Sequence, residues 1–262
     1  MVENKSSEIT QEMNYLFKIW SDALSLSPMD LENSLSFELA GYLKISKNFI
    51  KEHWGNAVGD LKKSWNKINP RTSQEIINFY NTNETQLLES MYWHSQIGHA
   101  ITDNVRSLQI ALSAGGKNYL DYGCGVGSNG ILFSKYGFEI TLADISSVML
   151  NFAEYRFKKR GLKANFIDLK TSDLPRTHFD FITIIHTLEH VSNPINLFEK
   201  VVKSAKIGGI LFVTTPFFKD KERPMHIVTE MSITEKFLNF GVVQLPKSTE
   251  IVKIYQKVKE NG

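Results

Sequence analysis

The sequence predicts a doubly wound α/β fold, in which a block of helices precedes a mostly parallel sheet of seven strands. Two observations support this prediction. From residue 118 onward, short apolar runs alternate with amphipathic stretches, as in strand–helix units that build a parallel sheet. Before residue 112, apolar residues recur at helical spacing and strand signals are nearly absent. We therefore expect a helical domain over residues 1–112 and an α/β domain over residues 113–262.

The first part of the chain carries start and stop signals of helices. The helices expected there begin near residues 27, 49, 72, 83 and 99. Ser27 followed by Pro28 is typical of a helix start, because proline fits the first helical position. The apolar stripe from Phe49 to Trp65 predicts one continuous helix, despite two glycines within it. Thr72 and Glu75 predict a capping box, in which each side chain accepts a hydrogen bond from the other residue's backbone.

The second part of the chain alternates strands with helices and closes in a hairpin. The seven expected strands cover residues 119–122, 139–143, 164–167, 179–185, 210–214, 241–245 and 250–258. The fourth of these is apolar enough to be buried on both faces of a sheet. Ser146 and Ser232 are expected to cap two of the intervening helices, Ser232 within a capping box. A further helix is expected from Pro194 to about Gly208.

Composition excludes several classes of protein. The chain of 262 residues is 42% hydrophobic and 22% charged, and its net charge of +2 excludes a strongly basic nucleic-acid wrapper. A single cysteine, Cys124, forbids an intramolecular disulfide and a multi-cysteine zinc site. No apolar run approaches the ~20 residues needed to span a bilayer, and the first residues lack the pattern of a signal peptide. We therefore expect a cytoplasmic protein without a membrane span.

The charge divides unevenly along the chain. Residues 1–112 hold ten Lys+Arg and thirteen Asp+Glu, a net −3; the totals of 30 and 28 leave twenty and fifteen for the remainder, a net +5. Residues 38–46 have the spacing of a helix-turn-helix, but a net acidic module is repelled by the phosphates of DNA. We therefore expect no DNA binding and interpret the first part as a cap over the α/β domain.

The segment from Asp121 to Gly127 is a glycine-rich turn between the first strand and a helix. Glycines there let the backbone turn sharply and approach a ligand. The segment from Gly125 to Gly130 also matches G-x-G-x-x-G, the dinucleotide pattern, and Asp144 follows at about the expected ~20 residues. In either case Asp144 would accept hydrogen bonds from ribose hydroxyls. The spacing alone leaves NAD and another adenosine cofactor both open.

A set of matches in order gives the segment from about residue 118 to residue 213 a specific resemblance. The matching segments are Asp121-x-Gly123-x-Gly125-x-Gly127, Asp144, Phe166–Leu169, Phe179–Ile182, Leu188–Val191 and Gly208–Leu211. This pattern resembles the class I S-adenosylmethionine-dependent methyltransferases. The Leu-Glu-His-Val turn at Leu188–Val191 is similar to that of the ubiquinone-biosynthesis branch, which acts on small molecules. None of the matching segments lies in residues 1–112, so the resemblance says little about the substrate.

The resemblance implies a Rossmann-like methyltransferase fold and S-adenosylmethionine as the cofactor. It implies cofactor contacts from the glycine turn and from the ends of the next strands: Asp121, Gly123, Cys124, Gly125, Gly127, Asp144, Ile145, Asp168, Leu169 and His186. The turn would hold the methionine end, Asp144 the ribose, and Asp168 with Leu169 the adenine. Cys124 is interpreted as a packing residue, with a reactive thiol as the alternative.

Methyl transfer from a sulfonium requires an acceptor held in line and shielded from water. A hydroxyl acceptor also needs a base or a metal that lowers its pKa. His186 would face Glu189 and His190 on one helical turn, and His226 would follow the fifth strand at the same sheet edge. These four side chains could bind a divalent metal, for which Zn, Fe or Mn suits nitrogen ligands. The cluster resembles the metal-dependent methyltransferases that modify the terminal ribose of small RNAs, except that His186 replaces their first glutamate.

Several interpretations of these residues remain open. The cluster is either a metal site, a metal-free site with His190 and His186 as catalytic groups, or a structural feature. Tyr92, Trp93 and His94 form either a lid over the acceptor or part of the core. We expect O-methylation of a small-molecule acceptor; the alternatives are an RNA 2′-O-methyltransferase, an N- or C-methyltransferase of a metabolite, a non-catalytic protein that binds S-adenosylmethionine, and an NAD-dependent oxidoreductase. The oligomeric state is not predicted.

Overall fold

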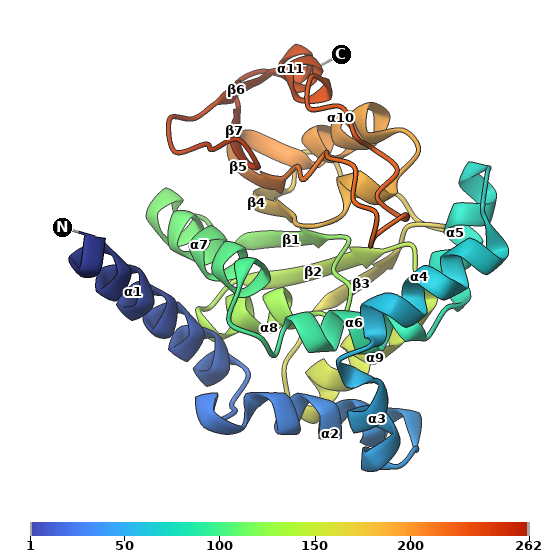
Figure 1. Ribbon diagram of the computed structural model, residues 1–262. Helices are drawn as coiled ribbons and strands as arrows, with labels where there is room; N and C mark the ends of the chain where they lie inside the picture. Colours follow the sequence, from blue (N-terminus) through green and yellow to red (C-terminus); the bar gives the residue numbers. More distant parts are fainter. Residues whose placement is uncertain (1, 261–262) are drawn as a thin grey trace.

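The computed structural model describes residues 2–260 and contains one seven-stranded sheet. The strands are β1 (Asn118–Tyr122), β2 (Glu139–Asp144), β3 (Asn165–Asp168), β4 (Phe179–Ile184), β5 (Ala205–Thr214), β6 (Val242–Gln244) and β7 (Val252–Lys257). They lie in the order β3-β2-β1-β4-β5-β7-β6, and β7 runs antiparallel to both of its neighbours. The predicted mostly parallel sheet of seven strands is confirmed (Figure 1).

Helices precede the sheet, as predicted. They are α1 (Val2–Ala23), α2 (Leu31–Leu43), α3 (Lys47–Trp54), α4 (Ala57–Ile68), α5 (Ser73–Thr82), α6 (Thr85–Trp93) and α7 (His99–Ala114). The capping box at the start of α5 is formed, with both the Thr72 and the Glu75 hydrogen bonds present. Within residues 2–260, none of the helices combines the length and the apolar character that crossing a membrane requires.

Some predicted element boundaries are wrong. The stripe from Phe49 to Trp65 is two helices, because α3 ends at Gly55 and the turn lets both α3 and α4 pack on α6. Ser232 makes no capping hydrogen bond with its side chain, since its own backbone is already helical at the start of α11 (Ile233–Phe237). Strand β5 starts at Ala205, five residues before the predicted start, because Ala205 already pairs with Phe179 of β4.

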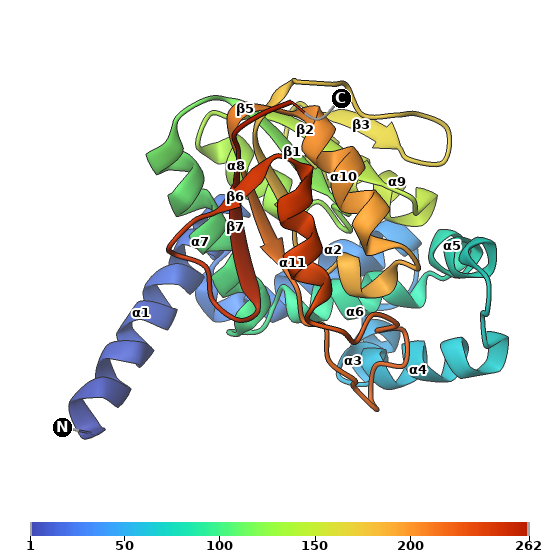
Figure 2. The same ribbon diagram turned by 90° about the horizontal axis from the view of Figure 1, so that it is seen from above.

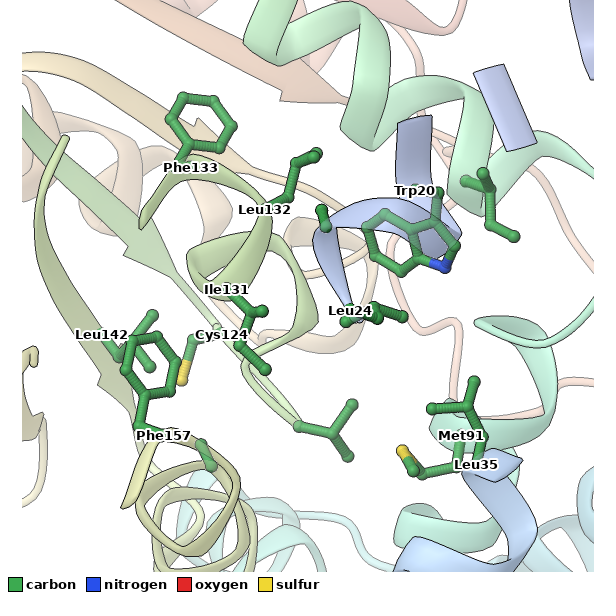
Figure 3. Close-up of a cluster of buried hydrophobic side chains, with 14 of the residues drawn as sticks. Trp20, Leu24, Leu35, Met91, Cys124, Ile131, Leu132, Phe133, Leu142 and Phe157 are labelled. Atoms are coloured by element: carbon green, nitrogen blue, oxygen red, sulfur yellow. The ribbon is translucent and has the colours of Figure 1, made fainter. Parts of the chain in front are cut away.

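Helices cover both faces of the sheet (Figures 1 and 2). Helices α8 (Ser128–Lys135) and α9 (Ser147–Lys159) lie on one face together with α1, α2 and α7, and α10 (Pro194–Ser204) lies with α11 on the other. The first face is covered by a hydrophobic cluster to which both parts of the chain contribute. Figure 3 shows Trp20 and Met91 from the first part, and Ile131 and Leu142 from the second, as members of this cluster.

A smaller hydrophobic cluster holds the segment that follows β5. Met225 of this segment is buried against Leu61, Trp65, Ile76 and Phe79, which belong to α4 and α5. The segment also bonds to the sheet side, because the backbone N–H of residues 227 and 228 donates to the carbonyl of residue 189. These contacts fix the position of the next side chain, residue 226, at the carboxyl edge of the sheet.

Candidate active site

The glycine-rich turn has the geometry of a ligand-binding loop. Gly123, Gly125 and Gly127 have φ values of 72°, 50° and 72°, a region that side chains disfavour. A Cβ on Gly123 would lie 2.3 Å from Thr187 Oγ1, so this glycine is needed for packing. A Cβ on Gly125 would meet no atom of the described residues within 4 Å. The turn is therefore open at Gly125, directly before the N-terminus of α8, where a ligand can approach the backbone.

Asp144 ties the end of β2 to this turn. Its Oδ2 accepts a hydrogen bond of 2.9 Å from Gly125 N, and its Oδ1 accepts one of 2.8 Å from Ser146 N. Burial raises the pKa of this carboxyl group, although the backbone donors oppose that effect. The side chain is thus held at the open side of the turn, where the sequence expectation put a ribose contact.

Asp121 leaves one carboxylate oxygen without a partner. Thr183 Oγ1 donates to its Oδ1 at 3.0 Å, whereas its Oδ2 is buried and accepts no hydrogen bond from any residue in the described range. Burial raises the pKa of Asp121 to about 7. An unpartnered buried oxygen is costly, and a donor on a bound ligand would satisfy it. This observation fits a cofactor that carries an ammonium group, as S-adenosylmethionine does.

Cys124 is buried within the turn. Burial raises the pKa of its thiol well above the ordinary value, so the nucleophilic thiolate is disfavoured. This supports the interpretation of Cys124 as a packing residue.

The residues expected near an adenine lie at the ends of β2 and β3. Asp168 pairs in register with Asp144, and Leu169 N donates to the Asp144 carbonyl at 3.0 Å. Lys170 Nζ lies 2.8 Å from an Asp168 oxygen and also donates to the Ile145 carbonyl at 2.7 Å. The predicted residues therefore share one edge of the site, and Asp168 already holds an ion pair that the sequence analysis missed.

His186 follows β4 in a sharp turn. Its φ of 49° is left-handed, and its backbone N–H donates to Thr214 Oγ1 at 2.7 Å. The predicted helical turn over residues 186–190 is therefore wrong, and only Leu188–His190 form a short 3₁₀ helix, η2. The next residue, Thr187, packs closely against Gly123 of the glycine-rich turn. The turn nevertheless brings His186 Nδ1 to 3.4 Å from Glu189 Oε1.

Glu189, His190 and His226 form a group of potential metal ligands. One ligand atom from each lies within 4.8 Å of the others. Glu189 is fully buried, and neither of its carboxylate oxygens nor His226 Nδ1 has a hydrogen-bond partner within residues 2–260. Burial and His190 lower the pKa of His226 to about 4, so its imidazole is neutral at pH 7. These features fit a divalent cation, which neutral imidazoles and a carboxylate bind.

His186 lies beside this group rather than within it. Its Nε2 is 3.9 Å from Asp103 Oδ2, and its Nδ1 faces Glu189. Burial alone would lower the pKa of His186, but Glu189 and Asp103 raise it above the ordinary value. His186 can therefore carry a proton near neutral pH, which distinguishes it from His226.

Tyr80 of α5 connects the helices that precede the sheet, α1–α7 (the helical block), to His190. Its hydroxyl lies 2.8 Å from His190 Nδ1, which is also 3.1 Å from the Met225 carbonyl. The Tyr80 carbonyl accepts a hydrogen bond of 2.6 Å from Ser146 Oγ, two residues beyond Asp144. Burial raises the pKa of Tyr80 far above its ordinary value, so the hydroxyl is neutral. The sequence analysis missed this residue, whose apolar neighbours Ile76 and Phe79 indicate only a core-facing helix.

The three residues predicted as a lid have separate environments. Trp93 Nε1 donates to Glu89 Oε1 at 3.1 Å, and the Arg223 guanidinium lies 5.1 Å from the centre of the Trp93 ring. Tyr92 packs edge-on against Trp54 and Trp93. His94 Nδ1 lies 3.0 Å from Ser128 Oγ at the start of α8. Trp93 therefore faces the segment that carries His226, whereas His94 contacts the glycine turn.

Comparisons with known proteins agree with this architecture. A family model described as a methyltransferase domain matches residues 92–254. A ubiquinone biosynthesis O-methyltransferase of Coxiella burnetii is 34% identical over 111 residues, which are 41% of this chain and 46% of that protein. One of Dechloromonas aromatica is 31% identical over 108 residues, 40% of this chain and 47% of that protein. The matches thus span less than half the length of these curated relatives.

Solved structures are also similar to the chain. A SAM-dependent methyltransferase from Aquifex aeolicus has a TM-score of 0.46 and 22% sequence identity, over 58% of this chain and 89% of that one. The family model, by contrast, covers more than half of the chain in sequence. The chain therefore belongs to the methyltransferase domain family.

Proposed function

We propose that this enzyme transfers the methyl group of S-adenosylmethionine to a hydroxyl of a small-molecule acceptor, with a divalent metal bound by Glu189, His190 and His226. The observation that carries the proposal is the convergence of ligand atoms from Glu189, His190 and His226. His226 Nδ1 is buried without a hydrogen bond among the described residues, and Glu189 Oε1 has ion-pair contacts with His186 Nδ1 at 3.4 Å and His190 Nε2 at 3.9 Å. The names of the curated relatives support O-methylation as the class of reaction.

The cofactor would lie along the carboxyl edge of β1, β2 and β3. In this proposal the turn around Gly125 receives the methionine moiety, and the unpartnered Asp121 oxygen accepts from its ammonium group. Asp144 would accept from the ribose hydroxyls, and Asp168 with Leu169 would border the adenine. The cofactor supplies an electrophilic methyl on a sulfonium, so the protein's task is to orient the acceptor and exclude water.

His190 supports the activation of the acceptor hydroxyl. A carbonyl only accepts hydrogen bonds, so in the tautomer that donates to Met225 O the proton is on His190 Nδ1, and the Tyr80 hydroxyl accepts from the same nitrogen. Nε2 then keeps its lone pair on the side of Glu189, 3.9 Å from Oε1. There Nε2 can bind a cation or accept the hydroxyl proton. A cation bound by these ligands would lower the pKa of the acceptor hydroxyl.

We assign the acceptor side to the helical block and to the segment after β5. Trp93 lies against Arg223 of that segment and donates to Glu89, whose carboxyl group is influenced electrostatically by His190 and Arg223. Residues 1–112 would then act as a substrate domain over residues 113–262. His186, whose pKa Glu189 and Asp103 raise, would be a second catalytic group that holds a proton beside the acceptor.

A methyl-transfer screen tests the proposed function. The purified protein is incubated with S-adenosylmethionine and phenols, aliphatic alcohols, amines or small RNAs, with and without a chelator, and S-adenosylhomocysteine release is measured. We expect turnover with a hydroxyl compound, loss of turnover with the chelator, and recovery with Zn²⁺, Fe²⁺ or Mn²⁺. Chelator-resistant methylation of an amine would contradict the proposal, and methylation of RNA would replace the small-molecule acceptor. Where a variant that lacks a histidine of the cluster is assayed, His178→Ala is its control, because His178 is exposed before β4 and lies outside the cluster.

A further inference from the structure

A buried cluster of charges joins helix α2 of the helical block to helix α9 of the α/β domain. Arg156 Nε lies 3.3 Å from Glu38 Oε2, and Arg160 Nη2 lies 3.0 Å from the same oxygen. The Arg156 side chain is fully buried, and that of Glu38 is 3% exposed. This cluster lies outside the group of potential metal ligands and has no place in the proposed methyl transfer.

Both partners of the buried pair are charged at neutral pH. Burial alone would raise the pKa of Glu38, but Arg156, Arg160 and Lys159 lower it to about 2. Burial lowers the pKa of Arg156 to about 10, which still leaves the guanidinium protonated. A buried charge that loses its partner is strongly destabilising, so Glu38 and Arg156 hold each other in place.

Arg156 also holds the backbone of the glycine turn. Its Nη1 donates to the Val126 carbonyl at 2.7 Å and to Ser128 Oγ at 2.6 Å. Because Ser128 Oγ accepts from Arg156, its own proton is available for His94 Nδ1 at 3.0 Å. His94 can accept that proton, since burial and the nearby Arg156 lower its pKa to about 3 and keep it neutral. The hydrogen bonds therefore run in one direction, from Arg156 through Ser128 to His94.

The two groups that Arg156 binds, the Val126 carbonyl and the Ser128 hydroxyl, belong to the residues on either side of Gly127. Glycines such as Gly125 and Gly127 have many accessible conformations, so an unrestrained turn would lose entropy when a ligand binds. Helix α9 limits this freedom in two ways. Ala153 packs against Gly127, where a Cβ would lie only 2.9 Å from the Ala153 Cβ, and Arg156, one turn later, binds Val126 and Ser128.

We infer that Arg156 is a positioning residue for S-adenosylmethionine: Glu38 of the helical block fixes Arg156, and Arg156 fixes the glycine turn in its binding conformation. The helical block then contributes to cofactor affinity without touching the cofactor. This inference rests on the proposed placement of the cofactor at the glycine turn.

Arg160 offers a matched control on the same helix. It pairs with the same Glu38, but its other hydrogen bonds go to the carbonyls of Leu24 and Arg156 rather than to the turn. Arg156→Lys and Arg160→Lys therefore both weaken the charge cluster, and only Arg156→Lys also changes the contacts with Val126 and Ser128. A lysine keeps the charge but loses the planar, forked arrangement of donors.

The test is calorimetric titration of the full-length variants with S-adenosylhomocysteine, together with thermal unfolding. We expect both substitutions to lower the Tm, Arg156→Lys to raise the Kd about tenfold, and Arg160→Lys to leave the Kd within about twofold of wild type. Equal effects of the two variants on the Kd, or an unchanged Kd in Arg156→Lys, would overturn the inference. A wild-type protein that does not bind S-adenosylhomocysteine would instead refute the proposed cofactor site.

A smaller substitution keeps the inference testable if Arg156→Lys does not fold. Ser128→Ala removes one of the two contacts that Arg156 makes with the turn, and alanine is favourable in a helix. We expect it to raise the Kd for S-adenosylhomocysteine about threefold. An unchanged Kd in Ser128→Ala would contradict a role of this hydrogen-bond chain in cofactor binding.

Discussion

The α/β domain and the helical block contribute to the candidate active site in different ways. The α/β domain offers backbone and side-chain groups that strand ends and a glycine turn hold in place, such as Gly125 N and Asp144. The helical block reaches the site through isolated side chains, of which Tyr80 contacts His190 and Trp93 contacts Arg223. The first arrangement depends on the order of secondary-structure elements, whereas the second depends on how separate helices pack.

The charge of the two regions has a structural counterpart at their interface. The helical block is net acidic and the remainder of the chain is net basic. Glu38 of the acidic block is buried against Arg156 and Arg160 of α9. A second pair between the regions, Lys62 of α4 with Glu222 of the segment after β5, has the opposite polarity and is more exposed. The Glu38 pair thus joins the two regions through groups of opposite charge.

The largest expected effect comes from breaking this pair. Glu38→Gln leaves Arg156 buried without a countercharge, and we expect it to lower the free energy of unfolding at pH 7 by about 3 kcal/mol. The folded-state pKa of Glu38, about 2, lies below its ordinary value of 4.5, so its contribution is present above pH 4.5 and is lost as the pH falls towards 2. Denaturant unfolding measured from pH 7 down to pH 3 should show that the difference in the free energy of unfolding between Glu38→Gln and wild type becomes smaller as the pH falls.

Glu32→Gln is the control for this prediction, because Glu32 is exposed on the same helix. It should leave stability within about 0.5 kcal/mol of wild type. A Glu38→Gln variant as stable as wild type at pH 7 would show that the two regions are not held together by this pair.

The next largest effect is expected on cofactor binding by the α/β domain, where strand ends hold the binding groups. Asp144→Ala removes the carboxylate proposed to bind the ribose and frees Gly125 N, and we expect the Kd for S-adenosylhomocysteine to rise about a hundredfold. Calorimetric titration measures it, with Glu139→Gln at the exposed start of the same strand as the control. Unchanged affinity in Asp144→Ala, or tight binding of NAD to the wild type, would contradict the proposed cofactor site.

A smaller effect tests the region that depends on helix packing. Tyr80→Phe keeps the aromatic ring but removes the hydroxyl bonded to His190 Nδ1, and we expect kcat to fall about fivefold with an unchanged KM for S-adenosylmethionine. Steady-state kinetics with the acceptor found in the screen measures both values. Tyr15→Phe, at an exposed tyrosine of α1, should change neither. An unchanged kcat in Tyr80→Phe would contradict a role of the hydroxyl in holding His190.

The contrast between groups held by strand ends and groups placed by helix packing explains which features the sequence alone could predict. The strands follow from apolar runs between turn residues, and the glycine turn with Asp144 follows from local spacing that one strand–turn–helix unit fixes. The break between α3 and α4 was missed because glycine is compatible with a helix and the decisive contacts are with α6. Glu38 and Tyr80 were missed because their partners lie 118 and 110 residues away in the sequence.

The histidine cluster was predicted from the sequence only in part. The sequence suggested Glu189, His190 and His226 from their positions after β4 and β5, which parallel topology brings to one edge. It also predicted that His186 would face Glu189, but not the left-handed conformation of His186 or its approach to Asp103. The Asp103 partner lies on α7, 83 residues earlier in the chain, so no local pattern reports that contact.

The most direct test of the account is the metal content of the purified protein, measured by inductively coupled plasma mass spectrometry beside calorimetric titration with S-adenosylhomocysteine. The account predicts about one equivalent of Zn, Fe or Mn per chain in the wild type. His226→Ala should lose that metal and keep the wild-type affinity for S-adenosylhomocysteine, with His178→Ala unchanged in both measurements. A wild-type protein that binds S-adenosylhomocysteine but holds no stoichiometric metal, even after incubation with each ion, would contradict the metal-assisted transfer.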